Sequence, residues 1–144
     1  MTELSKVLYT AKATAEGGRD GHTATDDGRL DVRLVPPAEM GGPADGVGTN
    51  PEQLFAAGYS ACFASAMQLV AKQQGLDVSE ASVTAEVTLN GLDGGRFGLS
   101  VVLRAELPEE LHGEKGQALL EATHQVCPYS NATRGNIPVE IVVE

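Results

Sequence analysis

Two cysteines, Cys62 and Cys127, are the only thiols in the chain, and their sequence settings differ. Cys62 lies in the small apolar run GYSACFASAM (58–67), whereas Cys127 precedes a proline and several turn formers in HQVCPYSNATRGN (124–136). In a protein without a secretory signal, paired thiols are more often catalytic or metal-binding than structural. Cysteine is also a common inert core residue, so both interpretations stay open at this point.

A reactive Cys62 needs a cation from elsewhere in the chain. Helical spacing puts it on an apolar face, where burial raises the pKa of a thiol. It lies about a dozen residues into the predicted helix, beyond the reach of the N-terminal dipole. Among the arginines near predicted turns, Arg19 is favoured, because the glycines of EGGRDG (16–21) allow close backbone approach. The residues that share the face of Cys62 are Leu54, Phe55, Gly58, Ala66 and Leu69.

The spacing of His124 and Cys127 also suggests metal ligation, but a zinc site needs three or four ligands. Only His22, His112 and Cys62 could add to them, and none of these has paired spacing. We therefore predict no metal site and interpret His124 as a cation at a helix C-terminus.

Length and charge exclude several classes of protein. The 144 residues predict a single domain over 1–144. Twenty acidic against ten basic residues give a net charge of −10, which repels nucleic acids and anionic membranes. The first residues show no signal-peptide pattern, and no apolar run approaches the ~20 residues that span a bilayer. These features predict a cytoplasmic protein.

The pattern along the chain predicts an α+β fold in the order β-β-β-α-β-β-α-β, because runs of strands are separated by isolated helices. Hairpins are expected around DDG (26–28) and GLDGG (91–95). The predicted helices cover 51–74 and 114–126, and the predicted strands cover 5–13, 22–25, 29–35, 81–91, 96–107 and 137–144.

The long helix has clear start and stop signals. Asn50 can cap it, Pro51 suits its first position, Gln53 stands where a capping box needs it, and Gly75 can end it. Small residues occupy almost every side, which predicts burial all round. Because one small subunit could hardly cover such a helix, we expect a tight homodimer. The small residues are Ala56, Ala57, Gly58, Ser60, Ala61, Ala64, Ser65 and Ala66.

Two contiguous motifs, GTNPEQLFAAGYSACF (48–63) and HQVCPYSNATRGN, resemble the organic hydroperoxide resistance (Ohr) family, a branch of the OsmC-like proteins. The resemblance covers essentially the whole chain. It implies antiparallel sheets packed around two central helices in an intertwined homodimer. In that family one cysteine attacks the peroxide and the second resolves it, while an arginine and a glutamate complete the site. The matching residues are Cys62, Cys127, Arg19 and Glu52.

The resemblance thus implies a thiol-dependent peroxidase. Its Cys62 thiolate would become a sulfenic acid, which Cys127 would convert to a disulfide. Arg19 would stabilise the thiolate, and Glu52 would fix the guanidinium in a charge-assisted, bidentate pair. No bound cofactor is expected. An external dithiol must reduce the disulfide, and the resemblance implies the dihydrolipoamide of lipoylated proteins.

The sequence leaves several details open. Ten residues of straight helix separate Glu52 from Cys62 by about 15 Å. Arg19 would therefore span between them, the helix would bend, or the glutamate would come from the partner, and we favour a contribution from the dimer. Glu52 is also explained as an anion in the first turn of a helix. Four polar residues of the second motif fit capping and turn formation: Asn131, Thr133, Arg134 and Asn136.

An apolar substrate pocket is expected around Cys62. Each methylene buried there would add roughly 0.8 kcal/mol, so alkyl or lipid hydroperoxides should be favoured over hydrogen peroxide. Two alternatives remain: a general OsmC-like peroxidase that also takes hydrogen peroxide, and a non-catalytic protein that binds a lipid-like ligand in an apolar cleft. The expected pocket residues are Leu54, Phe55, Met67 and Tyr129, together with Leu69.

Overall fold

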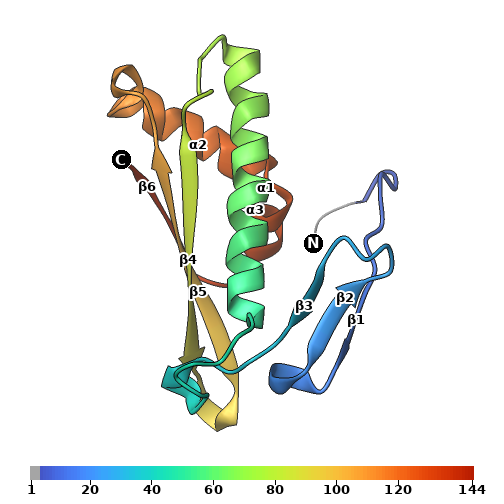
Figure 1. Ribbon diagram of the computed structural model, residues 1–144. Helices are drawn as coiled ribbons and strands as arrows, with labels where there is room; N and C mark the ends of the chain where they lie inside the picture. The colour runs from blue at the N-terminus through green and yellow to red at the C-terminus, as the bar shows by residue number, and fades with distance from the viewer. Residues whose placement is uncertain (1–3) are drawn as a thin grey trace. The chain divides into compact units, whose positions relative to one another are not determined.

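The computed structural model describes residues 4–144 (Figure 1). They form two compact units, one that ends at Leu54 and one that spans Phe55–Glu144. The first holds a small sheet, and the second holds another sheet with most of the helical residues. The α+β class is confirmed, and the predicted element order is confirmed apart from one additional short helix. The single domain over 1–144 stays a prediction.

The sheet of the first unit contains β1 (Ala13–Glu16), β2 (His22–Thr25) and β3 (Asp31–Arg33). All its pairings are antiparallel, in the order β1-β2-β3. The hairpin predicted around 26–28 is therefore confirmed. The strand predicted over 5–13 is wrong for most of its length, because β1 begins at Ala13. Alternating apolar residues need a neighbouring strand, and none among residues 4–144 pairs with 5–12.

Arg19 lies in a short 3-10 turn, Gly18–Asp20, between β1 and β2. The turn depends on glycine at both ends. Gly17 has a φ of 76°, in the left-handed region. A Cβ added at Gly21 would lie 1.8 Å from the carbonyl oxygen of Glu16, so no side chain fits there. Further 3-10 turns cover Ala38–Met40, Asp93–Gly95 and Glu109–Leu111.

The long helix α1 runs from Pro51 to Gln74, as predicted. Asn50 caps it, because its Oδ1 accepts a hydrogen bond from the backbone N–H of Gln53 at 2.8 Å. The Gln53 side chain does not complete a capping box. It accepts a hydrogen bond from the Thr49 hydroxyl at 2.7 Å instead. Gly75, with a φ of 71°, follows the last helical residue.

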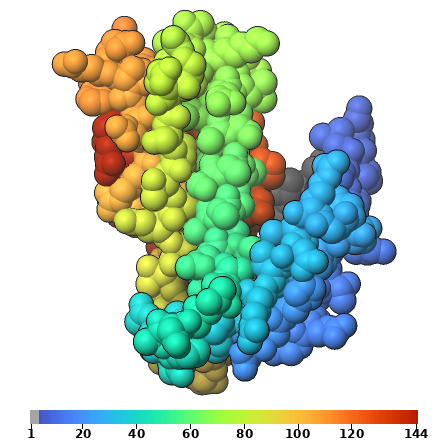
Figure 2. Space-filling model, viewed as in Figure 1, coloured from blue at the N-terminus to red at the C-terminus, as the bar shows by residue number. Residues whose placement is uncertain are grey.

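One side of α1 is buried and another is exposed in the single chain, so the burial predicted all round is not met there. Tyr59, Phe63 and Met67 are buried, whereas Leu69 is 50% exposed and Ala61 is exposed. Figure 2 shows the exposed side of α1, in green, along the visible surface. By length and composition alone this helix could also cross a membrane, a property that core helices share.

The sheet of the second unit contains β4 (Ser82–Gly91), β5 (Phe97–Glu106) and β6 (Val139–Val143), in that order. β4 and β5 form the predicted antiparallel hairpin. β6 pairs with β5 in parallel, and in this one pair the structure differs from the antiparallel sheets that the resemblance implies. The chain between β5 and β6 contains helices, and such a crossover returns the chain in the parallel direction.

That crossover contains two helices rather than one. α2 covers Glu114–Val126, as predicted, and α3 covers Pro128–Thr133. The predicted helix ends at 126, and the sequence pattern did not predict α3 after it. A proline at the first position suits a new helix, because its missing N–H is not needed there. Cys127 is the only residue between the two helices.

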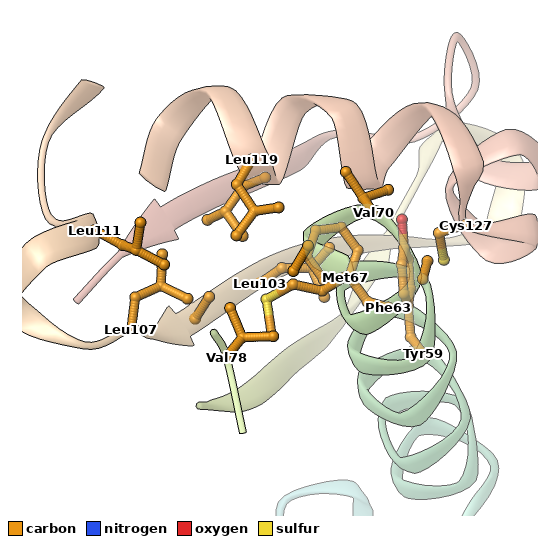
Figure 3. Packing of buried hydrophobic residues seen from close by; sticks show 14 of the residues in the cluster. Tyr59, Phe63, Met67, Val70, Val78, Leu103, Leu107, Leu111, Leu119 and Cys127 are labelled. Carbon is orange, nitrogen blue, oxygen red and sulfur yellow. The ribbon is translucent and has the colours of Figure 1, made fainter. Parts of the chain in front are cut away.

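A single apolar cluster joins α1, β5 and α2 in the second unit (Figure 3). Phe63 and Met67 come from α1, Leu103 from β5 and Leu119 from α2, and each is at most 1% exposed. Cys127 belongs to the same cluster. The two segments that carry the cysteines are therefore fixed in one core.

Replacing Leu103 by alanine should lower the free energy of unfolding by about 2–5 kcal/mol, because it leaves a cavity in this core. Urea denaturation checks this. Leu92→Ala serves as the control, since its side chain is 46% exposed. It should change stability by no more than about 0.5 kcal/mol. Equal losses for the two variants would contradict the assignment of the core.

Candidate functional site

The structure brings Cys62 and Cys127 together. Their sulfurs lie 3.4 Å apart although 65 positions separate them in the chain, and both thiols are free. Cys62 is half-buried on α1, and Cys127 is fully buried. A disulfide has an S–S length of about 2.05 Å, so an oxidant could join the two thiols with only a small approach of the sulfurs.

The environment of Cys62 in the second unit opposes ionisation. Burial raises the pKa of its thiol, a hydrogen bond from the backbone N–H of Tyr129 lowers it, and the neighbouring Cys127 thiol raises it again. The net effect is a pKa above the ordinary value. The sequence analysis predicted the effect of burial but missed the Tyr129 amide. The proline after Cys127 was the available signal, since it marks a helix start whose first amides have no helical partner.

The turn at Cys127 is held by side chains that follow it. The Asn131 amide donates a hydrogen bond to the backbone carbonyl of Gln125 at 3.1 Å. Arg134 donates to Asn131 Oδ1 at 2.7 Å and also to the carbonyl of His124. The capping interpretation is therefore confirmed for Asn131 and Arg134, which satisfy carbonyls at the end of α2.

Arg19 and Glu52 form a bidentate ion pair in the first unit. Arg19 Nη1 donates to Glu52 Oε1 at 2.6 Å, and Nη2 donates to Oε2 at 3.0 Å. The side chain of Arg19 is 34% exposed and that of Glu52 is 17% exposed. The hydrogen bond from Arg19 to Glu52 is the main cause that raises the pKa of the guanidinium. The pair forms within one chain, so it requires no glutamate from a partner subunit.

An open cavity of about 600 Å³ lies in the second unit beside the turn of Cys127. Phe55 of α1, Leu99 of β5 and Tyr129 of α3 line it, together with Ala132 and Ile137. The walls are mainly apolar. A cavity of this size and chemistry suits a small apolar ligand.

The expected pocket residues have different positions. Phe55 and Tyr129 line the cavity. Met67 is 1% exposed and belongs to the core cluster rather than to the cavity wall, while Leu69 is half-exposed. Leu54 is the last residue of the first unit. Sequence reasoning missed Leu99 and Ile137, because helical spacing from Cys62 says nothing about segments that approach from elsewhere in the chain.

No group of three or more His, Cys, Asp or Glu side chains within residues 4–144 is arranged to hold a metal ion. His124 has a buried Nδ1 without a hydrogen-bond partner, and burial is the main cause that lowers the pKa of its ring. The chemistry present is therefore that of two adjacent thiols, a paired arginine and an apolar cavity.

The geometry defines an α+β protein in which two cysteines face each other. Residues 42–142 match the family described as OsmC-like protein. The chain is 51% identical over 144 residues to the organic hydroperoxide resistance protein of Xanthomonas axonopodis pv. citri, with 99% of each chain covered.

Solved structures agree with this match. An organic hydroperoxide resistance protein from Elizabethkingia anophelis is 50% identical, with a TM-score of 0.90 over 97% of this chain and 99% of that one. Organic hydroperoxide resistance protein OhrB of Bacillus subtilis is 45% identical, with a TM-score of 0.87 over 96% and 100%. The chain therefore belongs to the OsmC-like family, in its organic hydroperoxide resistance branch.

Proposed function

We propose that the protein is a thiol-dependent peroxidase that reduces organic hydroperoxides to alcohols. The observation that carries the proposal is the 3.4 Å separation of two free sulfurs, one half-buried and one fully buried. Relatives named for organic hydroperoxide resistance support the substrate class.

The proposed reaction has two steps. The Cys62 thiolate attacks one peroxide oxygen, the O–O bond breaks, and the departing alkoxide takes a proton and leaves as an alcohol. Cys62 is then a sulfenic acid. The Cys127 sulfur attacks the Cys62 sulfur, an S–S bond forms, and water leaves. One peroxide is reduced and two thiols are oxidised.

Arg19 is the proposed cation that keeps Cys62 ionised. A guanidinium favours the thiolate, and its forked donors can orient the peroxide oxygens. Glu52 would hold Arg19 in position, a role supported by the bidentate pair at 2.6 and 3.0 Å. Such a cation is needed because burial in the second unit raises the pKa of Cys62.

The apolar cavity is the proposed site for the tail of the peroxide. It is lined partly by Tyr129, two residues after Cys127. Each buried methylene would contribute roughly 0.8 kcal/mol, which hydrogen peroxide cannot gain.

Regeneration requires an external dithiol, for which we propose dihydrolipoamide carried by lipoylated proteins. This dithiol would attack the Cys62 sulfur, because Cys127 is fully buried. The proposal also includes a cytoplasmic location and a homodimer. The half-exposed Leu69 on α1 supports the dimer, since a second copy would cover it.

One equivalent of cumene hydroperoxide should remove two hydrogen atoms from the protein mass, and peptide mapping should find Cys62 joined to Cys127. Intact mass spectrometry provides the measurement. Cys127→Ser should instead gain one oxygen atom at Cys62, because no second thiol is present, and should proceed to sulfinic acid when a second equivalent of the peroxide is added.

Cys62→Ser should show no mass change with this reagent. An unchanged mass in the wild type would overturn the peroxidase and leave the non-catalytic binding protein, whose apolar cleft would hold a lipid-like ligand. Oxidation of Cys127 in Cys62→Ser, together with an unreactive Cys62 in Cys127→Ser, would reverse the assigned roles.

The rate of oxidation should rise with the length of the alkyl hydroperoxide, by about fourfold for each methylene that the cavity buries. Stopped-flow assays of hydrogen peroxide and a series of alkyl hydroperoxides measure this. Leu99→Asn, in the cavity wall, should flatten the series. Leu92→Asn is the matched control outside the wall. Equal rates for hydrogen peroxide and the longer substrates would favour the general peroxidase.

A further inference from the structure

Three hydroxyl groups form a buried network between α1 and α3. The Tyr59 hydroxyl lies 2.9 Å from Ser130 Oγ and 3.1 Å from Thr133 Oγ1. Tyr59 and Ser130 are completely buried, and Thr133 is 6% exposed. Within residues 4–144, these two are the only hydrogen bonds that join a side chain of α1 to a side chain of α3.

The direction of the hydrogen bonds follows from proton counting. The Thr133 hydroxyl donates its only proton to the Ser130 carbonyl at 3.2 Å, so it can only accept from Tyr59. Tyr59 thus donates to Thr133 and accepts from the Ser130 hydroxyl. Each hydroxyl donates once, and the chain of bonds ends on a backbone carbonyl. The network is fully satisfied without water.

The network stands next to both cysteines. Tyr59 precedes Cys62 by one helical turn on α1, and Ser130 follows Cys127 by three residues in α3. Tyr59 and Cys127 belong to the same buried cluster (Figure 3). A shift of α3 relative to α1 would therefore move the Cys127 sulfur away from Cys62.

Aromatic packing supports the same contact. The rings of Tyr59 and Tyr129 have centroids 5.6 Å apart. A Cβ added at Gly58 would lie 2.7 Å from the Tyr129 hydroxyl, so glycine lets this ring approach the helix backbone. Packing alone tolerates sliding between apolar surfaces, whereas hydrogen bonds in a low-dielectric interior fix one register.

We propose that Tyr59 is a positioning residue, which holds α3 on α1 through Ser130 and Thr133 so that the Cys127 sulfur stays within reach of Cys62. The inference rests on the proposed function for its role in catalysis. In that setting it governs the second step, because a Cys62 sulfenic acid that Cys127 cannot reach meets another peroxide and becomes sulfinic acid.

Two substitutions break the network while keeping most of the apolar volume. Tyr59→Phe removes both hydrogen bonds between α1 and α3, whereas Thr133→Val removes only the bond from Tyr59 to Thr133. We expect Thr133→Val to lower the effective concentration of the thiol pair about five- to tenfold, the factor that one lost hydrogen bond predicts, and Tyr59→Phe to lower it at least as much. Equilibration of the purified protein with reduced and oxidised glutathione measures this quantity. It needs no peroxide, so it tests the positioning role even if the protein is not a peroxidase.

Matched controls separate positioning from general stability. Thr133→Ser keeps the hydroxyl and should retain an effective concentration within about twofold of the wild type. Thr123→Val removes another buried hydroxyl, which bonds only to Leu119 of its own helix at 2.8 Å. It should lower the unfolding midpoint without changing the glutathione equilibrium.

Titration with cumene hydroperoxide provides the catalytic readout. Mass spectrometry should find a larger fraction of protein with Cys62 as sulfinic acid in Tyr59→Phe and Thr133→Val than in Thr133→Ser.

Glutathione equilibria equal to the wild type in both Tyr59→Phe and Thr133→Val would overturn the inference. An equal fall in Thr123→Val would overturn it too, because the effect would then follow stability. A wild type inert to peroxide, with the equilibria shifted as expected, would overturn only the proposed function.

Discussion

The half-buried thiol of Cys62 resists the ionisation that a nucleophile needs. Cys62 lies on the long helix α1 among apolar groups, and burial is the largest of the causes that raise its pKa. The backbone N–H of Tyr129 partly offsets this effect. Apolar walls also suit a peroxide with a hydrocarbon tail, so in the proposed peroxidase the same burial that favours the substrate opposes ionisation of the nucleophile. In our account, a charged arginine resolves this conflict.

The structure divides the required groups between two sets. The first is the bidentate pair of Arg19 and Glu52, built on a glycine turn and the first turn of α1. The second is the pair of sulfurs, 3.4 Å apart, one on α1 and one at the turn between α2 and α3. The first set supplies a cationic guanidinium, and the second supplies two thiols that can be oxidised. The proposed peroxidase needs both.

Local signals in the sequence predicted local structure well. Asn50 and Gly75 gave the bounds of α1, because caps and glycine termini act within a few residues. The same reasoning missed α3 and the parallel pairing of β6, and it placed a strand over 5–13. Pairing partners are set by distant parts of the chain. The proximity of Cys62 and Cys127 came only from the family resemblance, since no spacing rule connects residues 65 positions apart.

The most direct test is the pKa of Cys62, from the pH dependence of its alkylation rate in the Cys127→Ser background. Our account predicts a value below that of an ordinary thiol when Arg19 is present. Arg19→Gln should raise it, so that fast alkylation appears only at higher pH, while Arg29→Gln should leave it unchanged. A Cys62 with an ordinary or raised pKa that does not respond to the loss of Arg19 would contradict the account.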